Sequence, residues 1–208
     1  MAARAVDQNR RMEGPLLLFS HGNGEDLEAI LPLLETFRAR GVSVIAYDYP
    51  GYGSSSGVPS ERGVYAAVDA VYRHATSSLG FAPEQIVLYG RSLGSGPSCW
   101  IAERYPVGGL ILEGAFTSTF RVMTHIKLLP WDKFDNLARM PRIKCPVLIL
   151  HGKRDQVVPF SHAEKLWRKI PGERERLWLD QAGHADIAYV GGQGYWDTVL
   201  DFIRTTGA

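Results

Sequence analysis

The sequence contains little cysteine and no excess of charge of either sign. Two of its 208 residues are cysteines, Cys99 and Cys145, too few for the disulfide framework of a small secreted domain. We therefore expect a reduced, cytoplasmic protein with both thiols buried as small apolar side chains. The 23 basic and 22 acidic residues leave a formal net charge of +1 and are spread along the chain. This balance gives no indication of a nucleic-acid partner.

Long apolar segments are also missing. No run approaches the roughly 20 residues that span a bilayer, and residues 1–14, MAARAVDQNRRMEG, lack the apolar core of a signal peptide. We expect no leader or membrane anchor in this N-terminal extension. A chain of 208 residues without internal repeats or linkers can bury the core of one α/β domain, so we predict a single domain over 1–208.

The six histidines show no metal-binding spacing. None belongs to an HExxH-type pattern, so we expect neither a metal nor a cofactor. All except His184 are predicted to be solvated or structural. His21 and His151 each end an apolar strand, and we therefore expect these two to lie beside the active site.

The stretch 86–96, IVLYGRSLGSG, is the most informative part of the chain. An apolar, β-branched run leads into Ser92, which has Gly90 and Gly94 two residues away on either side. This G-x-S-x-G pattern between a strand and a helix is typical of a nucleophile elbow, where the serine takes a strained backbone and the glycines avoid collisions. The hydroxyl would project at a helix N-terminus, where the dipole and free N–H groups favour a developing oxyanion.

Two further motifs follow in the order that α/β-hydrolases use, which is serine, acid, histidine. Asp155 follows the apolar run 147–150 in HGKRDQVVP, and His184 follows another apolar run in AGHADI. Together with HGNGED, YDYPGYGSSSG and GRSLGSGP, these motifs resemble the α/β-hydrolase superfamily. Within it, they are similar to the small-lid serine hydrolases that include the animal protein depalmitoylases. The resemblance spans residues 16–203.

This resemblance implies a catalytic triad of Ser92, Asp155 and His184. It also implies an oxyanion hole made by two backbone N–H groups. One belongs to Asn23, in the HGNG loop after the first strand, and the other to Leu93, directly after the nucleophile.

Two other carboxylates compete for a catalytic role. Glu113 ends an apolar strand at the active-site edge, where some hydrolases keep the triad acid, but the loop of Asp155 is the more usual source. Asp48, in the DYPGYG loop, is expected to make structural hydrogen bonds. Region 114–145 is the place for a short lid. Its apolar content favours an acyl chain beside the serine, although a core-packing helix would show the same pattern.

The predicted fold is α/β, with about six mostly parallel strands and helices on both faces. Strands are expected at 15–20, 42–47, 86–89, 107–112, 147–150 and 177–179. Helices are expected at 25–40, 60–80, 93–105, 161–170 and 195–203. The two N-terminal edge strands usual in the family have no counterpart in residues 1–14, so strand 42–47 would be an exposed edge. We expect residues 1–14 or a second subunit to cover it, the latter forming a homodimer.

These features predict a serine hydrolase that cleaves carboxylic esters of small or medium acyl chains through an acyl-enzyme. A thioesterase acting on acylated proteins is the alternative that the resemblance implies, because esters and thioesters pass through the same oxyanion. A serine peptidase ranks third, since no acidic pocket for a substrate amine is evident. A non-catalytic binding domain ranks last, because all three triad residues are present. The expected partner is therefore a small-molecule ester or an acylated substrate.

Overall fold

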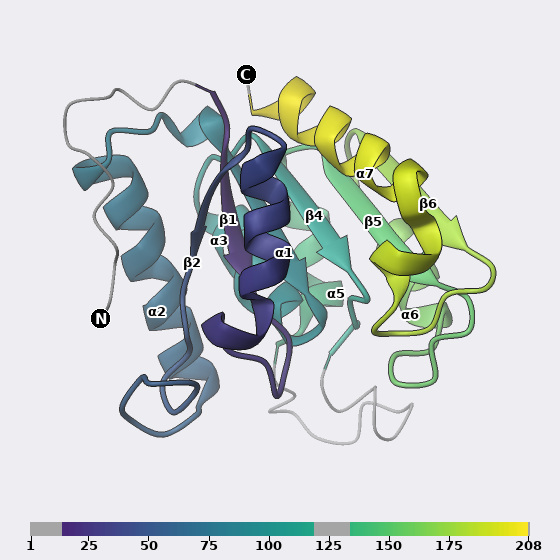
Figure 1. Ribbon diagram of the computed structural model, residues 1–208, viewed down its shortest axis with the longest axis horizontal. Helices are drawn as coiled ribbons and strands as arrows, with labels where there is room; N and C mark the ends of the chain where they lie inside the picture. The colour runs from purple at the N-terminus through teal and green to yellow at the C-terminus, as the bar shows by residue number, and fades with distance from the viewer. Residues whose placement is uncertain (1–13, 119–133, 208) are drawn as a thin grey trace.

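The described residues form one parallel β-sheet between two layers of helices (Figure 1). The computed structural model describes residues 14–118 and 134–207. Six strands follow the order β2-β1-β3-β4-β5-β6, and all neighbours are parallel, which confirms the predicted fold class. The strands are β1 (Leu16–Ser20), β2 (Ser43–Ala46), β3 (Ile86–Arg91), β4 (Gly109–Glu113), β5 (Val147–Gly152) and β6 (Arg174–Leu179).

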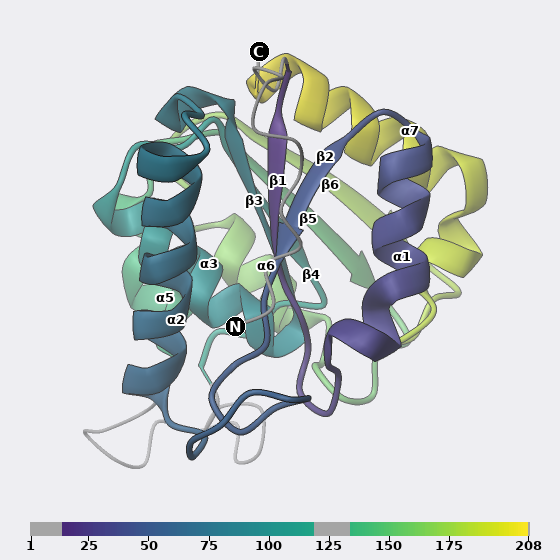
Figure 2. The same cartoon turned by 60° about the vertical axis from the view of Figure 1, so that its left-hand side comes forward.

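Helices cover both faces of the sheet. The helices are α1 (Leu27–Ala39), α2 (Glu61–Arg73), α3 (Ser95–Arg104), α5 (Asn136–Arg139), α6 (Ser161–Trp167) and α7 (Ile187–Thr206). Helices α1 and α7 lie on one face, and α2, α3, α5 and α6 lie on the other (Figures 1 and 2). In the described part of the chain, no helix combines the length and apolarity needed to cross a membrane. Because all strands are parallel, their carboxyl ends meet at one edge, where open α/β sheets bind ligands.

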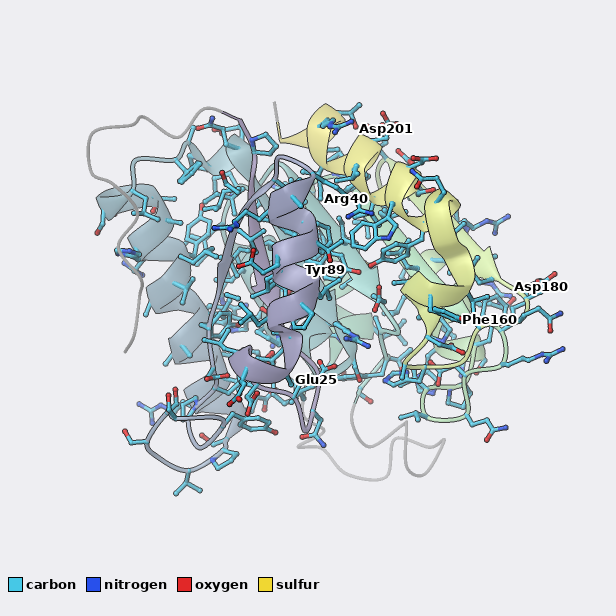
Figure 3. All side chains as sticks on the ribbon, viewed as in Figure 1. Glu25, Arg40, Tyr89, Phe160, Asp180 and Asp201 are labelled. Carbon is cyan, nitrogen blue, oxygen red and sulfur yellow. The ribbon has the colours of Figure 1, made fainter. Side chains whose placement is uncertain are left out.

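Polar caps determine where α1 and α2 begin. The Asp26 side chain accepts the N–H of Ala29 at 2.8 Å, so α1 starts at Leu27 rather than at the predicted residue 25. Ser60 caps α2 in the same way. The cap leaves Glu25 outside the helix, in the loop that follows β1, and Figure 3 shows it just ahead of the first turn of α1.

The central strands are buried along almost their whole length. Alternate side chains of β1 face opposite layers: Leu16 and Leu18 pack with the core beneath α2 and α3, whereas Leu17 and Phe19 pack with the core beneath α1 and α7. Both faces are covered, which explains why these strands are continuous apolar runs instead of alternating ones.

Both cysteines are buried and neither is in a disulfide. Burial raises the pKa of Cys145 to about 12 and raises that of Cys99 well above the ordinary thiol value. Neither side chain is a thiolate at neutral pH, in keeping with the expected role of small apolar side chains.

The two sheet edges differ in charge. Strand β6 begins at Arg174, earlier than the predicted residue 177, and its Arg174, Glu175 and Arg176 are exposed. Charges on an edge strand discourage pairing with another chain. Strand β2, with the sequence SVIA, carries no charge and is half-buried. Residues 1–13, one of its two predicted covers, lie outside the described residues, and the homodimer stays a prediction.

Region 114–145, predicted to form a short lid, is described only at its two ends. Those ends pack inside the protein: Phe116, Phe134 and Met140 belong to the core beneath α3. Core packing therefore accounts for the apolar side chains of both ends. The middle of the region, 119–133, lies outside the described residues, and the lid stays a prediction for that part.

The closing helix is longer than predicted. Helix α7 begins at Ile187 instead of residue 195, although its backbone is interrupted at Gly192, where φ is 53° and ψ is −135°. Ile187 is only 1% exposed, so its burial docks the first turn against the core. Tertiary packing thus overrides the weak helix propensity of the glycines.

Candidate active site

Ser92 lies in a sharp turn between β3 and α3. Its φ of 50° falls in the left-handed region, which costs a non-glycine residue about 1–2 kcal/mol. A Cβ at Gly94 would lie 1.9 Å from the backbone oxygen of Ser20, and one at Gly90 would lie 2.6 Å from the backbone oxygen of Gly94. Both glycines of the predicted elbow are therefore required because their neighbours leave no room for a side chain.

The elbow is supported from beneath by two polar side chains that the sequence patterns did not reveal. The hydroxyl of Ser95 donates to the carbonyl of Ser92 at 2.7 Å and accepts from Nδ2 of Asn136 at 3.0 Å. Asn136 also donates to the carbonyl of Phe116 at 3.0 Å, and both Ser95 and Asn136 are fully buried. This network links the elbow to both ends of region 114–145.

The structure brings the three predicted triad residues together. His184 Nε2 lies 2.9 Å from Ser92 Oγ, and His184 Nδ1 lies 2.6 Å from Asp155 Oδ2. A carboxylate can only accept, so Nδ1 carries the proton and Nε2 is the atom that faces the serine. The arrangement can take a proton from the Ser92 hydroxyl as that hydroxyl attacks an electrophile.

The loop after β5 holds Asp155 in one orientation. Its Oδ1 accepts the N–H groups of Val157 at 2.9 Å and Val158 at 2.7 Å, which leaves Oδ2 directed at His184. Burial raises the pKa of Asp155, but hydrogen bonds from His184 and Val158 outweigh it and lower that pKa below its ordinary value. The carboxylate is therefore ionised whenever the protein is near neutral pH.

A glycine at the end of β4 makes room for the histidine ring. Gly114 has a φ of 57°, and a Cβ there would lie 3.0 Å from Cε1 of His184. Both the backbone conformation and the close approach of the ring therefore favour glycine at this position.

His151 lies beside the acid, as predicted. Its Nε2 donates to the carbonyl of Val158 at 2.9 Å and lies 3.5 Å from Oδ2 of Asp155. Burial lowers the pKa of His151 below its ordinary value, despite the nearby carboxylate. A neutral His151 thus supports the acid loop without adding charge to it.

The predicted oxyanion loop lies against the nucleophile. A Cβ at Gly22 would be 3.5 Å from Cβ of Ser92. Nδ1 of His21 donates to the carbonyl of Gly22 at 2.9 Å, and the hydroxyl of Tyr52 donates to Oδ1 of Asn23 at 2.6 Å. In a planar trans peptide the N–H points opposite to the carbonyl, so His21 orients the Asn23 N–H. Leu93 follows Ser92 in the turn, where the second predicted donor is expected.

The two competing carboxylates are occupied elsewhere. Asp48 accepts the N–H of Leu27 at 2.9 Å, a structural hydrogen bond of the kind that was predicted. Glu113 accepts the hydroxyls of Tyr89 and Tyr195 at 2.5 and 2.9 Å, and it pairs with an arginine instead of with a histidine. Asp155 is thus the acid that reaches His184. Within residues 14–118 and 134–207, no group of three or more His, Cys, Asp or Glu side chains is arranged to hold a metal ion.

Known sequences match this chain over most of its length. Residues 15–134 match the family described as alpha/beta hydrolase fold. The chain is 39% identical over 178 residues to alpha/beta hydrolase domain-containing protein 17B of Xenopus laevis. The matched region covers 84% of this chain and 62% of that protein. It is 38% identical over 174 residues to alpha/beta hydrolase domain-containing protein aho-3 of Caenorhabditis elegans, with 82% and 52% covered. The chain therefore spans between half and two-thirds of the length of these relatives.

Solved structures share the architecture at low sequence identity. A monoacylglycerol lipase from Paleococcus ferrophilus aligns with a TM-score of 0.74 at 20% identity, covering 93% of this chain and 96% of that chain. An esterase from Pyrococcus furiosus aligns with a TM-score of 0.78 at 16% identity, covering 95% and 86%. At these identities the likeness is one of fold.

Proposed function

The chain belongs to the α/β-hydrolase family, and on that premise we propose that it is a serine hydrolase cleaving carboxylic esters of small or medium acyl chains. One observation carries the proposal: a continuous hydrogen-bonded chain runs from Ser92 Oγ through the imidazole of His184 to Asp155, with distances of 2.9 and 2.6 Å. A serine bonded to a histidine that a buried carboxylate orients is the arrangement that activates a hydroxyl nucleophile.

Acylation uses this chain of hydrogen bonds directly. Ser92 Oγ attacks the ester carbonyl carbon as its proton passes to Nε2 of His184, and Asp155 stabilises the resulting imidazolium. The N–H groups of Asn23 and Leu93 hold the negative charge that develops on the carbonyl oxygen. The tetrahedral intermediate then expels the alcohol, which takes the proton from His184 and leaves an acyl-serine.

Deacylation repeats the same steps with water. His184 takes a proton from a water molecule as its oxygen attacks the acyl-serine carbonyl, and the same two N–H groups hold the oxyanion. Ser92 leaves as an alkoxide that regains its proton from His184. The products are the free acid and the regenerated enzyme, and every proton in the cycle passes through one imidazole.

A thioesterase acting on acylated proteins is the second candidate. Two exposed apolar side chains favour it: Val157, two residues after Asp155, is 57% exposed, and Tyr189, on the first turn of α7 after His184, is 89% exposed. Apolar groups beside the triad loops offer contact to an acyl chain. A thioester with the same acyl group passes through the same tetrahedral oxyanion, so the chemistry of the site suits both substrates.

A fluorophosphonate probe tests the proposed chemistry. We expect it to label the wild type and the control Ser77→Ala, an exposed serine outside the site, but not Ser92→Ala. Turnover of p-nitrophenyl esters, from acetyl to palmitoyl, should disappear in the same variant. Labelling that persists in Ser92→Ala would refute the assignment of the nucleophile, and a folded but unlabelled wild type would favour the binding-domain alternative. The rate ratio between an ester and a thioester of equal acyl length then separates the two candidates.

A further inference from the structure

Charged side chains connect the two segments that carry the oxyanion donors. Glu25 places Oε2 2.7 Å from the N–H of Gly22 and Oε1 2.9 Å from Nη1 of Arg91. Arg91 also places Nε 3.2 Å from Oε1 of Glu113. We refer to Glu25, Arg91 and Glu113 as the ionic clamp. It joins the loop after β1, the residue before the nucleophile and the end of β4.

The clamp has a rigid base. The Glu113 side chain is 5% exposed, and its Oε2 accepts hydroxyls from Tyr89 and Tyr195. Burial and the charge of Glu113 raise the pKa of both tyrosines well above the ordinary value, so both remain donors. Arg91 and Glu25 are 21% and 26% exposed, which distinguishes them from surface ion pairs that water screens. Figure 3 shows Glu25 at the start of α1 and Tyr89 further along the sheet behind this helix.

The clamp acts on the peptide next to the donor peptide. Peptide 21–22 is bonded at both ends, because the Tyr49 hydroxyl donates to its carbonyl at 2.7 Å and Glu25 accepts its N–H. The following peptide carries the Asn23 N–H, and only the backbone torsions of Gly22 separate the two planes. A Cβ at Gly22 would lie 2.8 Å from Oε2 of Glu25, so a side chain at this position would displace the carboxylate from the Gly22 N–H.

We propose that Arg91 and Glu25 are positioning residues of the oxyanion hole. Arg91 directly precedes Ser92 and Leu93 in the chain, so its ion pair to Glu25 sets the Asn23 donor at a defined place relative to the Leu93 donor. The inference rests on the proposed hydrolase function.

Arg91 has a second effect through its charge. Glu25 brings a negative charge to the loop that must stabilise a developing oxyanion, and like charges in a partly buried site repel strongly. The guanidinium of Arg91 offsets the carboxylate at 2.9 Å. Removal of Arg91 alone therefore leaves an unpaired carboxylate in the oxyanion loop, whereas removal of both charges does not.

This charge argument predicts a rescue. We expect Arg91→Met to lower kcat by roughly 10- to 100-fold with KM changed by less than about twofold, because the defect lies in transition-state stabilisation. Glu25→Gln should lose less, since its amide oxygen can still accept the Gly22 N–H. The double variant Arg91→Met/Glu25→Gln should recover at least about threefold over Arg91→Met, because the unpaired charge in the oxyanion loop is gone. Glu113 also loses Arg91, but it keeps its hydrogen bonds from Tyr89 and Tyr195 in both variants.

The matched control is Arg139→Met. Arg139 is 16% exposed and pairs with Glu103 on the far side of the sheet, so its loss should lower thermal stability comparably while kcat stays within about twofold of the wild type. If the wild type is active and Arg91→Met has the same kcat, or if the kcat of the double variant is no higher than that of Arg91→Met, the positioning role of the ionic clamp is refuted. The proposed hydrolase function is unaffected by either result. A folded wild type that neither turns over nor reacts with fluorophosphonate would refute both.

Discussion

The substitution Asp155→Asn is the sharpest test of the triad, because the backbone N–H groups of the acid loop determine the orientation of the asparagine amide. In the wild type, Oδ1 accepts two N–H groups, from Val157 and Val158, and Oδ2 accepts Nδ1 of His184. Asparagine keeps the first two bonds only if its oxygen takes the Oδ1 place. Its amide Nδ2 then faces the imidazole.

An amide donor at that position changes which ring nitrogen of His184 carries the proton. Nδ1 of His184 must accept, so the proton moves to Nε2, which lies 2.9 Å from Ser92 Oγ and can no longer take the serine proton. We expect kcat to fall by about 10³- to 10⁴-fold, or about 4 to 5.5 kcal/mol of transition-state stabilisation. The fold should persist, since both backbone hydrogen bonds of the loop are kept.

The assay is kcat on p-nitrophenyl acetate, with urea unfolding to verify the folded state. Glu113→Gln is the comparison variant, because Glu113 was the alternative acid and contacts Arg91 and two tyrosines instead of His184. It should lose far less activity than Asp155→Asn. An Asp155→Asn protein within tenfold of the wild type, or a larger loss in Glu113→Gln, would refute the tautomer argument.

Two further predictions concern the framework of the site. Gly94→Ala should lower the free energy of unfolding by more than about 2 kcal/mol and abolish turnover, because its Cβ would lie 1.9 Å from the backbone oxygen of Ser20; Gly172→Ala, where nothing lies within 4 Å of the added Cβ, is the control. The pKa of His151 is lower in the folded protein than in the unfolded chain. Below about pH 6.5 the unfolded chain therefore binds more protons than the folded protein, and the free energy of unfolding decreases as the pH decreases. The loss of unfolding free energy between neutral and mildly acidic pH should therefore be smaller in His151→Gln than in the wild type, and an equal loss would contradict the neutral, buried imidazole.

The three side chains of the proposed triad could be located from sequence because each lies in a short motif with strict local demands. The elbow requires glycine on both sides of Ser92, and the acid and histidine each follow an apolar strand whose carboxyl end must reach the same edge. The choice of Asp155 over Glu113 came from the loop pattern, and the 2.6 Å contact to His184 agrees with it. The motifs and the family resemblance that they carry were together sufficient for these residues.

The ionic clamp could not be predicted in the same way. The apolar periodicity places Glu25 in the first turn of a helix, although Asp26 directly before Leu27 is a typical N-cap signal and is the cap that the helix uses. Its contact with Arg91 depends on β1 lying next to β3, and that of Arg91 with Glu113 on β3 lying next to β4. Strand order and register emerge only when the whole sheet is assembled. Ser95 and Asn136 were missed because their contact depends on how α3 packs against α5, which no local pattern shows.

The left-handed backbone of Ser92 affects which substitutions selection would favour at this position. At a φ of 50°, glycine would remove strain of about 1–2 kcal/mol, and such a gain is a large part of a domain's margin of stability. A protein that only bound a ligand would be stabilised by that replacement, whereas a hydrolase would lose its nucleophile. Selection for stability and selection for turnover thus oppose each other at this position. Serine in a conformation that suits glycine is therefore what selection for turnover would preserve and selection for stability alone would replace.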